Sequence, residues 1–416
     1  MTLLTARPSS SRLLAGPPLA AGTESGRDHL ARLGPLPNGA TARNVIPVLE
    51  ASGLLGRGGA GFPVGRKWRT VAERSAGGTV VLVNGAEGEP LSAKDRALMT
   101  LRPHLVLDGA QLAAEAVGAD EVILYVGSAH VTARRAIEAA LVERARYLPV
   151  PTRVLQAPDR YVAGEESAAV HFVNDADARP TTTPPRPFER GVGGRSTLVQ
   201  NVESIAYAAL IARAGDGWYR SAGRATTPGT GLVTVSGVPN PGVREIELGM
   251  TVGELGRLAG AERDRASAVL IGGYFGGWAT PDEAWDLALD PAGMRAARRA
   301  FGCGVVSFLP VETCGVTATA GIMGYMAGES AAQCGPCVFG LRAIADATER
   351  LARGNAEADD LARIERWSGQ LAGRGACRHP DGAVGLLASA LHVFGDEFLR
   401  HARRTCGVAV LRGVAA

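Results

Sequence analysis

Four glycines fall within six consecutive positions near the start of the chain, Gly56, Gly58, Gly59 and Gly61. Because glycine has no Cβ, such a backbone can approach a ligand closely, and its successive N–H groups can point at phosphate oxygens. Positive charge accompanies the glycines at Arg57, Arg66 and Lys67. The stretch therefore predicts a phosphate-binding loop, with a ligand-free surface loop as the alternative.

The spacing of Gly56, Gly58 and Gly61 also matches the dinucleotide fingerprint G-x-G-x-x-G. That fingerprint should follow a strand and open a helix. Here the apolar residues of 42–55 have helical spacing, and the nearest strand-like run, residues 80–83, comes afterwards. We therefore expect a phosphate-binding loop and not an ordinary NAD-binding Rossmann motif.

Polar side chains follow the strand that the sequence predicts over residues 79–84. Asn84, Glu87 and Glu89 come at its carboxyl end, among glycines and before a proline. An amide and two carboxylates there can accept hydrogen bonds from the hydroxyls of a ribityl or ribose chain and from a heterocycle. A solvated acidic turn is the alternative.

The cysteines supply a second kind of chemistry. Cys334 and Cys337 form a C-x-x-C pair at the start of a predicted helix, and Cys377 comes later with His379 just after it. Thiolates at a helix start with one from a distant loop can hold an iron–sulfur cluster or zinc. A redox-active dithiol or packed thiols are the alternatives. The other three cysteines have no such spacing and are expected to be buried thiols: Cys303, Cys314 and Cys406.

The apolar pattern predicts the elements that position these groups. Strands at residues 79–84, 121–126 and around 153–156 alternate with helices at 102–117 and 131–148. Such alternation is typical of an α/β parallel sheet with right-handed crossovers. Ligands of these sheets lie at the carboxyl ends of the strands, where the polar residues are expected.

The pattern changes twice along the rest of the chain. We expect a disordered lead-in over 1–35, an α/β domain over 36–228, a small β-grasp-like module over 229–280 and a helical region over 281–416. The module is predicted from a β-hairpin around the turn Pro239–Gly242, a capped short helix and a returning strand.

Composition limits the class of protein. With 46% hydrophobic and 20% charged residues, the 416-residue chain is typical of a globular protein, and a net charge of +3 gives no argument for nucleic acid. No apolar run is long enough to span a membrane, so a membrane link would come only through partners. Clustered cysteines favour a reducing, cytoplasmic compartment over a disulfide framework.

Together these stretches resemble the flavin-binding subunit of NADH:quinone oxidoreductase (respiratory complex I) and the related diaphorase subunits of NAD-linked hydrogenases and formate dehydrogenases. The resemblance runs in one collinear order from about residue 44 to residue 403. It includes the blocks 57–63, 87–96, 164–166 and 201–203 and the helix that carries Cys334.

This resemblance implies an electron-transfer oxidoreductase with FMN in the α/β domain, a soluble-ligand-binding β-grasp (SLBB-type) domain and a [4Fe–4S] cluster in the helical region. FMN takes a hydride from NADH and passes single electrons onward, so no side chain acts as acid, base or nucleophile. The resemblance assigns FMN to Gly58, Gly59, Gly61, Lys67, Asn84, Glu87 and Asn201. It places Phe62, Glu89 and Glu166 on the nicotinamide side.

The chain departs from the family at the cluster. Where the family's motif has its first cysteine, this chain has Ala331, which cannot coordinate iron. Cys334, Cys337 and Cys377 remain as ligands. Either another residue completes the site, with Cys314 and His379 as candidates, or the cluster has three irons or an open iron, or it is absent.

A second departure lies in the NADH pocket. Thr183 and Arg186 stand where the family has a lysine and an aromatic residue, Thr70 replaces a further aromatic, and Ala86 replaces the aspartate of the FMN motif. Losing stacking surface and a cation should weaken NADH binding. Two alternatives follow: an FMN protein reduced by a ferredoxin-like partner, or a non-catalytic docking subunit with zinc or no metal. In the main hypothesis the partners are other electron-transfer subunits.

Overall fold

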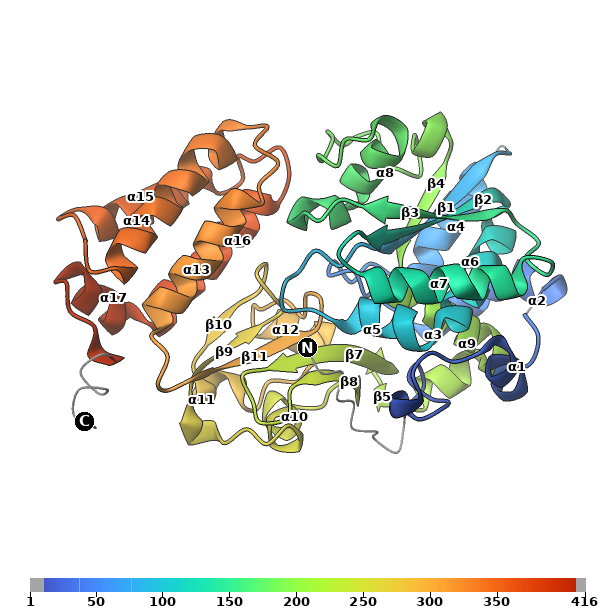
Figure 1. Cartoon of the computed structure of the whole chain (residues 1–416), viewed down its shortest axis with the longest axis horizontal. Helices are drawn as coiled ribbons and strands as arrows, with labels where there is room; N and C mark the ends of the chain where they lie inside the picture. The colour runs from blue at the N-terminus through green and yellow to red at the C-terminus, as the bar shows by residue number, and fades with distance from the viewer. Residues whose placement is uncertain (1–10, 37, 76, 409–416) are drawn as a thin grey trace. The chain divides into compact units, whose positions relative to one another are not determined.

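The computed structural model describes residues 11–36, 38–75 and 77–408 (Figure 1). The chain forms two compact units. The first comprises Met1–Thr234, Gly242–Met250 and Asp290–Ala292, and the second comprises Val235–Pro241, Thr251–Leu289 and Gly293–Ala416. The segment boundaries expected at residues 36, 229 and 281 stay predictions.

The first unit contains a four-stranded parallel sheet. Its strands are β1 (Thr79–Gly85), β2 (Ala119–Gly127), β3 (Thr152–Ala157) and β4 (Thr197–Asn201), in the order β3-β2-β1-β4. The expected α/β class and the three expected strands are confirmed. The sequence did not predict β4, because this run of five residues leads directly into a helix and has no turn signal between them.

Side chains of β1 alternate between two apolar layers, as the pleat of a strand requires. Val81 and Val83 pack into the larger layer, whereas Val80 and Leu82 pack into the smaller one. The larger layer is covered by several helices, and Figure 1 shows α3, α6 and α9 below the sheet with α8 above it. Burial on both faces explains why these strands are continuous apolar runs.

The helices of this unit are α1 (Gly26–Leu33), α2 (Ala40–Arg43), α3 (Val45–Ser52), α4 (Val64–Arg74), α5 (Lys94–Leu101), α6 (Pro103–Val117), α7 (Val131–Arg144), α8 (Glu166–Asp175) and α9 (Val202–Arg220). Short 3₁₀ turns lie at Leu19–Ala21, Tyr161–Gly164 and Val192–Gly194. The helices α6 and α9 pack closely at Gly109, where a Cβ would lie 2.0 Å from the carbonyl oxygen of Ile205. Only glycine fits at that crossing.

The N-terminal segment departs from the expectation of disorder over 1–35. Residues 1–10 lie outside the described residues, but from Ser11 onward the chain packs on the first unit. Leu13 and Leu14 are buried, and the carboxylate of Glu245 accepts the backbone N–H groups of Arg12, Leu13 and Leu14 at 2.9–3.0 Å. The expectation of disorder is therefore wrong for residues 11–35. The composition of this segment gives no sign of order, but the distant Glu245 accepts hydrogen bonds from its backbone N–H groups.

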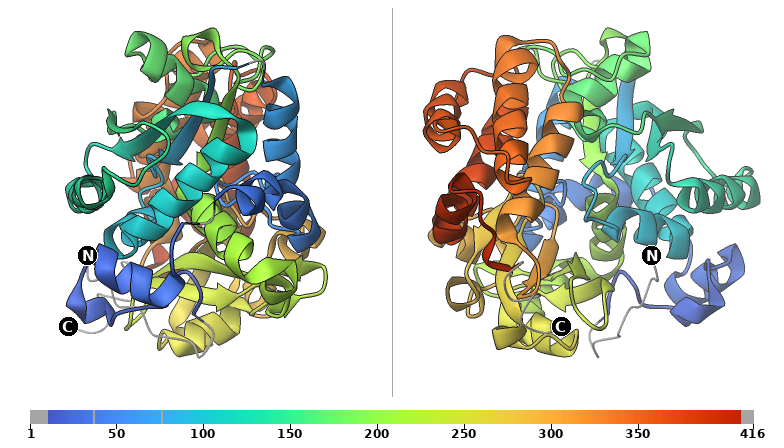
Figure 2. Two further views of the ribbon diagram at one scale, coloured as in Figure 1. Left: turned by 90° about the vertical axis from the view of Figure 1, so that its right-hand side faces the viewer. Right: turned by 60° about the vertical axis from the view of Figure 1, so that its left-hand side comes forward.

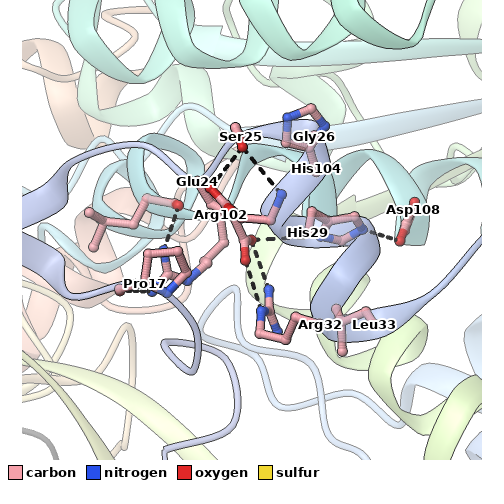
Figure 3. Close-up of polar contacts among 12 residues, drawn as sticks. Pro17, Glu24, Ser25, Gly26, His29, Arg32, Leu33, Arg102, His104 and Asp108 are labelled. Carbon is pink, nitrogen blue, oxygen red and sulfur yellow. Dashed lines mark hydrogen bonds and ion pairs between the residues drawn. The ribbon is translucent and has the colours of Figure 1, made fainter.

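Buried charged side chains hold this segment in place (Figure 3). Arg102 donates to the carbonyl oxygens of Leu14, Ala15 and Pro17 at 2.8–3.0 Å. His29 on α1 lies 2.8 Å from Asp108 on α6, and Glu24 forms a bidentate pair with Arg32. These bonds fix α1 against α6.

A five-stranded sheet has the order β10-β9-β11-β7-β8. Its strands are β7 (Thr230–Ser236), β8 (Gly242–Glu247), β9 (Ala266–Ile271), β10 (Gly277–Ala279) and β11 (Val305–Pro310). The helices α10 (Val252–Leu258), α11 (Pro281–Ala284) and α12 (Pro291–Ala296) and the 3₁₀ turn Arg263–Arg265 lie between strands in sequence, and β5 (Gly223–Arg224) and β6 (Thr227–Pro228) form a separate ribbon.

The strand β11 corrects the expectation that residues 281–416 are helical. It pairs antiparallel with β9, so Val306 faces Ile271 and Phe308 faces Val269. A short apolar run of this kind does not reveal by its period whether it is strand or helix. The hairpin expected around Pro239–Gly242 is confirmed by the neighbouring strands β7 and β8, and the β-grasp assignment stays a prediction.

The rest of the second unit is helical, as expected. It contains α13 (Gly315–Gly328), a π-helical turn η5 (Pro336–Leu341), α14 (Arg342–Ala352), α15 (Asp360–Leu371), α16 (His379–Val393) and α17 (Gly395–Ala402). These helices pack against one another in a bundle, drawn in orange to red in Figure 2. Among the described residues no single helix meets the length and apolarity of a membrane span, although α16 and α17, bent by 88°, do so as a pair.

Candidate functional site

The carboxyl ends of β1 and β4 bring two of the expected ligand residues together. In the parallel register, Asn84 at the end of β1 pairs with Asn201 at the end of β4. After β1 the chain builds β2 and β3 on one side and returns on the other side as β4, so the strand order reverses between β1 and β4. Such a switch point opens a crevice where α/β proteins bind ligands.

The glycine loop lies at this crevice. An isolated antiparallel β-bridge between Leu55 and Pro63 closes the loop. The N–H of Gly56 also donates to the carbonyl of Phe62 at 2.9 Å. A Cβ on Gly58 would lie 3.5 Å from the Cβ of Asn201, which places the loop beside the end of β4.

The backbone of the loop fits a phosphate group. Gly59 and Gly61 have φ values of +105° and +64°, which side chains disfavour, and the space beside both is open. Within the part of the chain that the structure describes, the N–H groups of Gly58, Gly59 and Gly61 have no protein acceptor. Free N–H groups on an exposed loop are the donors that a phosphate uses.

The cations of the loop have different roles. Arg57 is buried and donates to the hydroxyl of Tyr219 and the carbonyl of Thr230, so its side chain anchors the loop to the protein core. The expectation that Arg57 adds charge for a phosphate is therefore wrong. Lys67 on α4 forms a 2.8 Å ion pair with Glu166 at the start of α8, and both side chains remain partly exposed.

The end of β1 is fixed by its own hydrogen bonds. The amide of Asn84 donates to the carbonyl of Gly164 at 2.8 Å, and its oxygen accepts the N–H of Ala86 at 3.2 Å. The carboxylate of Glu89 accepts the hydroxyl of Tyr161 at 3.2 Å, and the residue is buried. Phe62, in contrast, is exposed on the loop.

Glu87 has a structural task in this arrangement. Its carboxylate accepts the N–H groups of Asp95 and Arg96 at 2.9 and 3.0 Å and the hydroxyl of Ser92 at 2.7 Å. It thus caps the first turn of α5, where a negative charge favours the helix dipole. A contact between Glu87 and FMN stays a prediction.

A buried charge cluster that sequence reasoning did not single out orients Asn201. The amide of Asn201 donates to Asp95 at 2.7 Å, and Lys94 lies 2.6 Å from Asp95 and 2.9 Å from Glu203. Burial raises the pKa of Asp95 to about 7, which the neighbouring ammonium opposes. Burial disfavours the charge of Lys94, but the carboxylates of Asp95 and Glu203 outweigh it and raise the pKa of Lys94. In the sequence, only the adjacent opposite charges of Lys94 and Asp95 pointed to this cluster.

A second missed residue is Gln200, beside Asn201 on β4. It is buried, and its Oε1 has no hydrogen-bond partner within the described residues. Its Nε2 would lie 4.0 Å from a Cβ on Gly56. An unpartnered buried amide oxygen at a ligand crevice can accept a donor from the ligand.

The predicted thiol ligands come together in the second unit. Cys334 and Cys337 lie one turn apart, with the N–H of Cys337 donating to the carbonyl of Cys334 at 3.1 Å. Burial, with the neighbouring thiols of Cys334 and Cys377, raises the pKa of Cys337 to about 12. Ala331 is buried and offers no ligand atom. An iron–sulfur cluster held by these three thiolates stays a prediction.

Of the two residues considered as a fourth ligand, Cys314 belongs to another group of side chains, whereas His379 stays a candidate, because its contact with Met326 engages Nε2 only. Cys314 lies 3.3 Å from His401, away in another group of side chains. The Nε2 of His379 lies 2.7 Å from the carbonyl oxygen of Met326, and the ring packs edge-on against Phe275.

Two family models match this chain. They are the Nuo51 FMN-binding domain at residues 49–209 and the NADH-ubiquinone oxidoreductase-F iron-sulfur binding region at residues 317–401. The chain is 31% identical over 379 residues to the second of two NADH-quinone oxidoreductase F subunits of Rhizobium meliloti, covering 87% of this chain and 89% of that protein. It is 33% identical over 377 residues to the NADH-quinone oxidoreductase F subunit of Mycobacterium tuberculosis, covering 86% and 84%.

The chain belongs to the family of NADH-quinone oxidoreductase F subunits. Its fold also matches a crystal structure of an NAD+-reducing [NiFe]-hydrogenase in the air-oxidized state, with a TM-score of 0.80 and 30% identity. That match covers 88% of this chain and 64% of the hydrogenase chain. The expected family is thereby confirmed, together with an oxidoreductase that has an FMN-binding domain and an iron–sulfur region.

Four residues stand at positions where the sequence is expected to depart from the NADH-quinone oxidoreductase family, and their effect on NADH binding stays a prediction. Thr183 and Arg186 are exposed, and the N–H of Arg186 donates to Glu189 at 2.8 Å. The hydroxyl of Thr70 donates to the carbonyl of Arg66 within α4, and Ala86 is buried in the smaller apolar layer. None of these four side chains offers an aromatic face.

Proposed function

We propose that this chain binds FMN in the crevice between β1 and β4 and passes electrons between FMN and an iron–sulfur cluster at Cys334, Cys337 and Cys377. The observation that carries the proposal is the register pair of Asn84 and Asn201 at the switch point, with Gly58 beside it. The match to the FMN-binding domain over residues 49–209, which contain the whole crevice, supports it.

Each residue has a defined task in this proposal. The N–H groups of Gly58, Gly59 and Gly61 bind the phosphate, and Lys67 balances its charge. Asn84 and Asn201 meet the ribityl hydroxyls and the ring, held by their bonds to Gly164 and Asp95. Bound FMN exchanges two electrons at once or one at a time, which links a hydride donor to a cluster.

The nicotinamide side is proposed to involve Phe62, Glu89 and Glu166. Phe62 offers an exposed aromatic face on the glycine loop. Glu166 forms an ion pair with Lys67, so a ligand that contacts one of the two side chains lies close to the other.

Partners and location extend the same proposal. The relatives are named as subunits of NADH-quinone oxidoreductase, so we infer that other electron-transfer subunits exchange electrons with this chain. None of the six cysteines, all of which lie among the described residues, forms a disulfide, and we infer a reducing, cytoplasmic location. We also propose three domains: an FMN-binding domain at 36–228, an SLBB-like domain at 229–280 and a helical iron–sulfur-type domain at 281–416.

A second candidate function has a ferredoxin-like protein as the electron donor in place of NADH. The observation that favours it is that Thr183 and Arg186 stand where the family has a lysine and an aromatic residue, and Thr70 stands in place of a further aromatic. A pocket without the stacking face and the lysine retains less affinity for a dinucleotide, whereas FMN keeps its own contacts.

The test is an FMN titration of flavin-free protein, followed by quenching of flavin fluorescence. Asn201→Ser keeps an N-cap for α9 but removes the amide, and it should weaken FMN binding about 10-fold. Asn174→Ser, which loses an amide bond to Gly191 outside the crevice, is the matched control and should bind FMN normally. If the wild type takes up no FMN, the chain is a docking subunit with zinc or no metal.

The same FMN-loaded protein identifies the donor. Bleaching of the flavin by NADH under anaerobic conditions would support NADH as the donor. Flavin that is reduced by a reduced ferredoxin but not by NADH would support the second candidate.

A further inference from the structure

A second group of metal-ligating side chains lies in the helical bundle, formed by Cys314, His401 and Cys406. One ligand atom from each lies within 4.8 Å of the other two. Cys314 is the residue before α13, His401 lies in the last turn of α17, and Cys406 follows that helix. Cys314 and Cys406 lie outside residues 317–401, which match the iron–sulfur region.

The histidine of this group is oriented as a ligand. His401 is 3% exposed, and its Nδ1 lies 2.9 Å from the carbonyl oxygen of Leu351. A carbonyl only accepts, so Nδ1 carries the proton and Nε2 presents its lone pair. That Nε2 faces the sulfur of Cys314 at 3.3 Å. A backbone carbonyl behind a histidine is a common outer partner of metal-bound imidazole.

A carboxylate lies beside the sulfur of Cys314. Glu397 precedes His401 by one helical turn, so both face the same side of α17. Its carboxylate oxygen lies 3.6 Å from the sulfur of Cys314 and also accepts the N–H of Gly315 at 2.9 Å. Two sulfurs and one nitrogen thus lie around a single point, with the Glu397 carboxylate beside one of the sulfurs.

The two separations from the sulfur of Cys314 are close to those around a mononuclear tetrahedral ion. With zinc–sulfur bonds of about 2.3 Å and zinc–nitrogen or zinc–oxygen bonds of about 2.0–2.2 Å, a tetrahedral site separates sulfur from nitrogen or oxygen by about 3.5–3.6 Å. The observed 3.3 and 3.6 Å are close to that spacing. Among the residues that the structure describes, the thiols of Cys334, Cys337 and Cys377 do not form such a tight group.

We propose that Cys314, His401 and Cys406 bind one Zn²⁺ ion that ties the C-terminal segment to the start of α13. Binding replaces the two thiol protons, so the ion and its two thiolates are neutral together. Three protein ligands leave the fourth tetrahedral position to a water molecule. This zinc site is separate from the iron–sulfur site and does not depend on FMN.

The test measures zinc and iron in the purified full-length chain by elemental analysis. We expect about one zinc per chain, in the wild type and equally in Cys337→Ser, which should lose iron. Cys314→Ser, His401→Gln and Cys406→Ser should each lower zinc about 10-fold or more. Cys303→Ser and His392→Gln, at a cysteine and a histidine outside the group, are the matched controls and should keep their zinc.

A measurement on the wild type guards against variants that fail to fold. Chelator-treated protein is titrated with Co²⁺, and a thiolate-bound tetrahedral ion gives intense visible bands. Reloading with Zn²⁺ should also slow tryptic cleavage after Arg403 and Arg404. The proposal is overturned if the wild type takes up neither ion, if zinc follows Cys337 in place of Cys314, or if peptide mapping finds a disulfide between Cys314 and Cys406.

Discussion

The crevice of the first unit and the thiol site of the second differ in how completely the chain supplies the groups that their cofactors need. At the crevice, Asn84 and Asn201 are already oriented by Gly164 and Asp95. At the thiol site, Ala331 leaves one position of the cluster without a thiolate. We infer that FMN binding depends on side chains that the protein already holds in position. Cluster binding depends instead on how many thiolates the chain supplies.

A complete loss of the cluster, expected on replacing the buried thiol, separates the two sites. Cys337→Ser leaves two thiolates, too few for a cluster, so iron should fall at least 10-fold. FMN binding should stay within about 2-fold of the wild type, because the crevice lies in the other unit. Elemental analysis and FMN titration of one preparation give both values. Cys303→Ser is the control, and equal loss of FMN and iron in Cys337→Ser would contradict independent sites.

The reverse separation comes from the glycine loop. Gly59→Val places a branched side chain at φ +105°, and the strain together with the blocked approach should weaken FMN about 100-fold. Iron content should not change. Gly22→Val is the control in the FMN titration. It places valine at a similarly strained φ of +80°, but outside the glycine loop. Normal FMN affinity in Gly59→Val would show that the phosphate does not lie on this loop.

A gain of function sharpens the comparison. Ala331→Cys supplies the missing thiol, and iron should rise from about three to about four per chain if the wild-type cluster lacks one iron. Electron paramagnetic resonance of the oxidised and reduced protein distinguishes the two cluster types. Ser330→Cys, at the neighbouring position, is the control. An unchanged spectrum in Ala331→Cys would mean that another ligand already completes the wild-type cluster.

The smallest expected effect concerns the N-terminal segment, which contains neither site. Burial opposes the charge of His29, but the carboxylates of Asp108 and Glu24 outweigh it and raise the pKa of His29. Its contribution to stability is therefore complete below about pH 6.5 and is lost as pH rises through the raised pKa. The thermal midpoint should fall more between pH 6 and 9 in the wild type than in His29→Gln, with iron and FMN unchanged. Identical pH profiles would rule out this contribution.

The sequence predicted those parts of the molecule that depend on local pattern. The continuous apolar runs of β1 and β2 marked a sheet buried on both faces, and Cys334 with Cys337 marked the thiol site. What it missed depends on contacts between distant residues. The strand β4 gains its identity only by pairing with β1, and the order of residues 11–35 depends on Glu245.

Two side chains show the same limit at the level of single residues. Arg57 appeared to be a phosphate ligand by its place in the glycine loop, yet Tyr219 and Thr230 draw it into the core. Cys314 appeared to be an ordinary thiol by its spacing, yet the fold brings His401 to it. Spacing along the chain carries no information on groups that meet only after folding.

The measurement that tests the account most directly is an anaerobic photoreduction of FMN-reconstituted protein, followed by absorbance and electron paramagnetic resonance. The account predicts that bound flavin bleaches and that an iron–sulfur signal appears in the same sample and disappears in Cys337→Ser. Flavin that is reduced without any cluster signal, or protein that retains no flavin, would contradict electron transfer between the two sites.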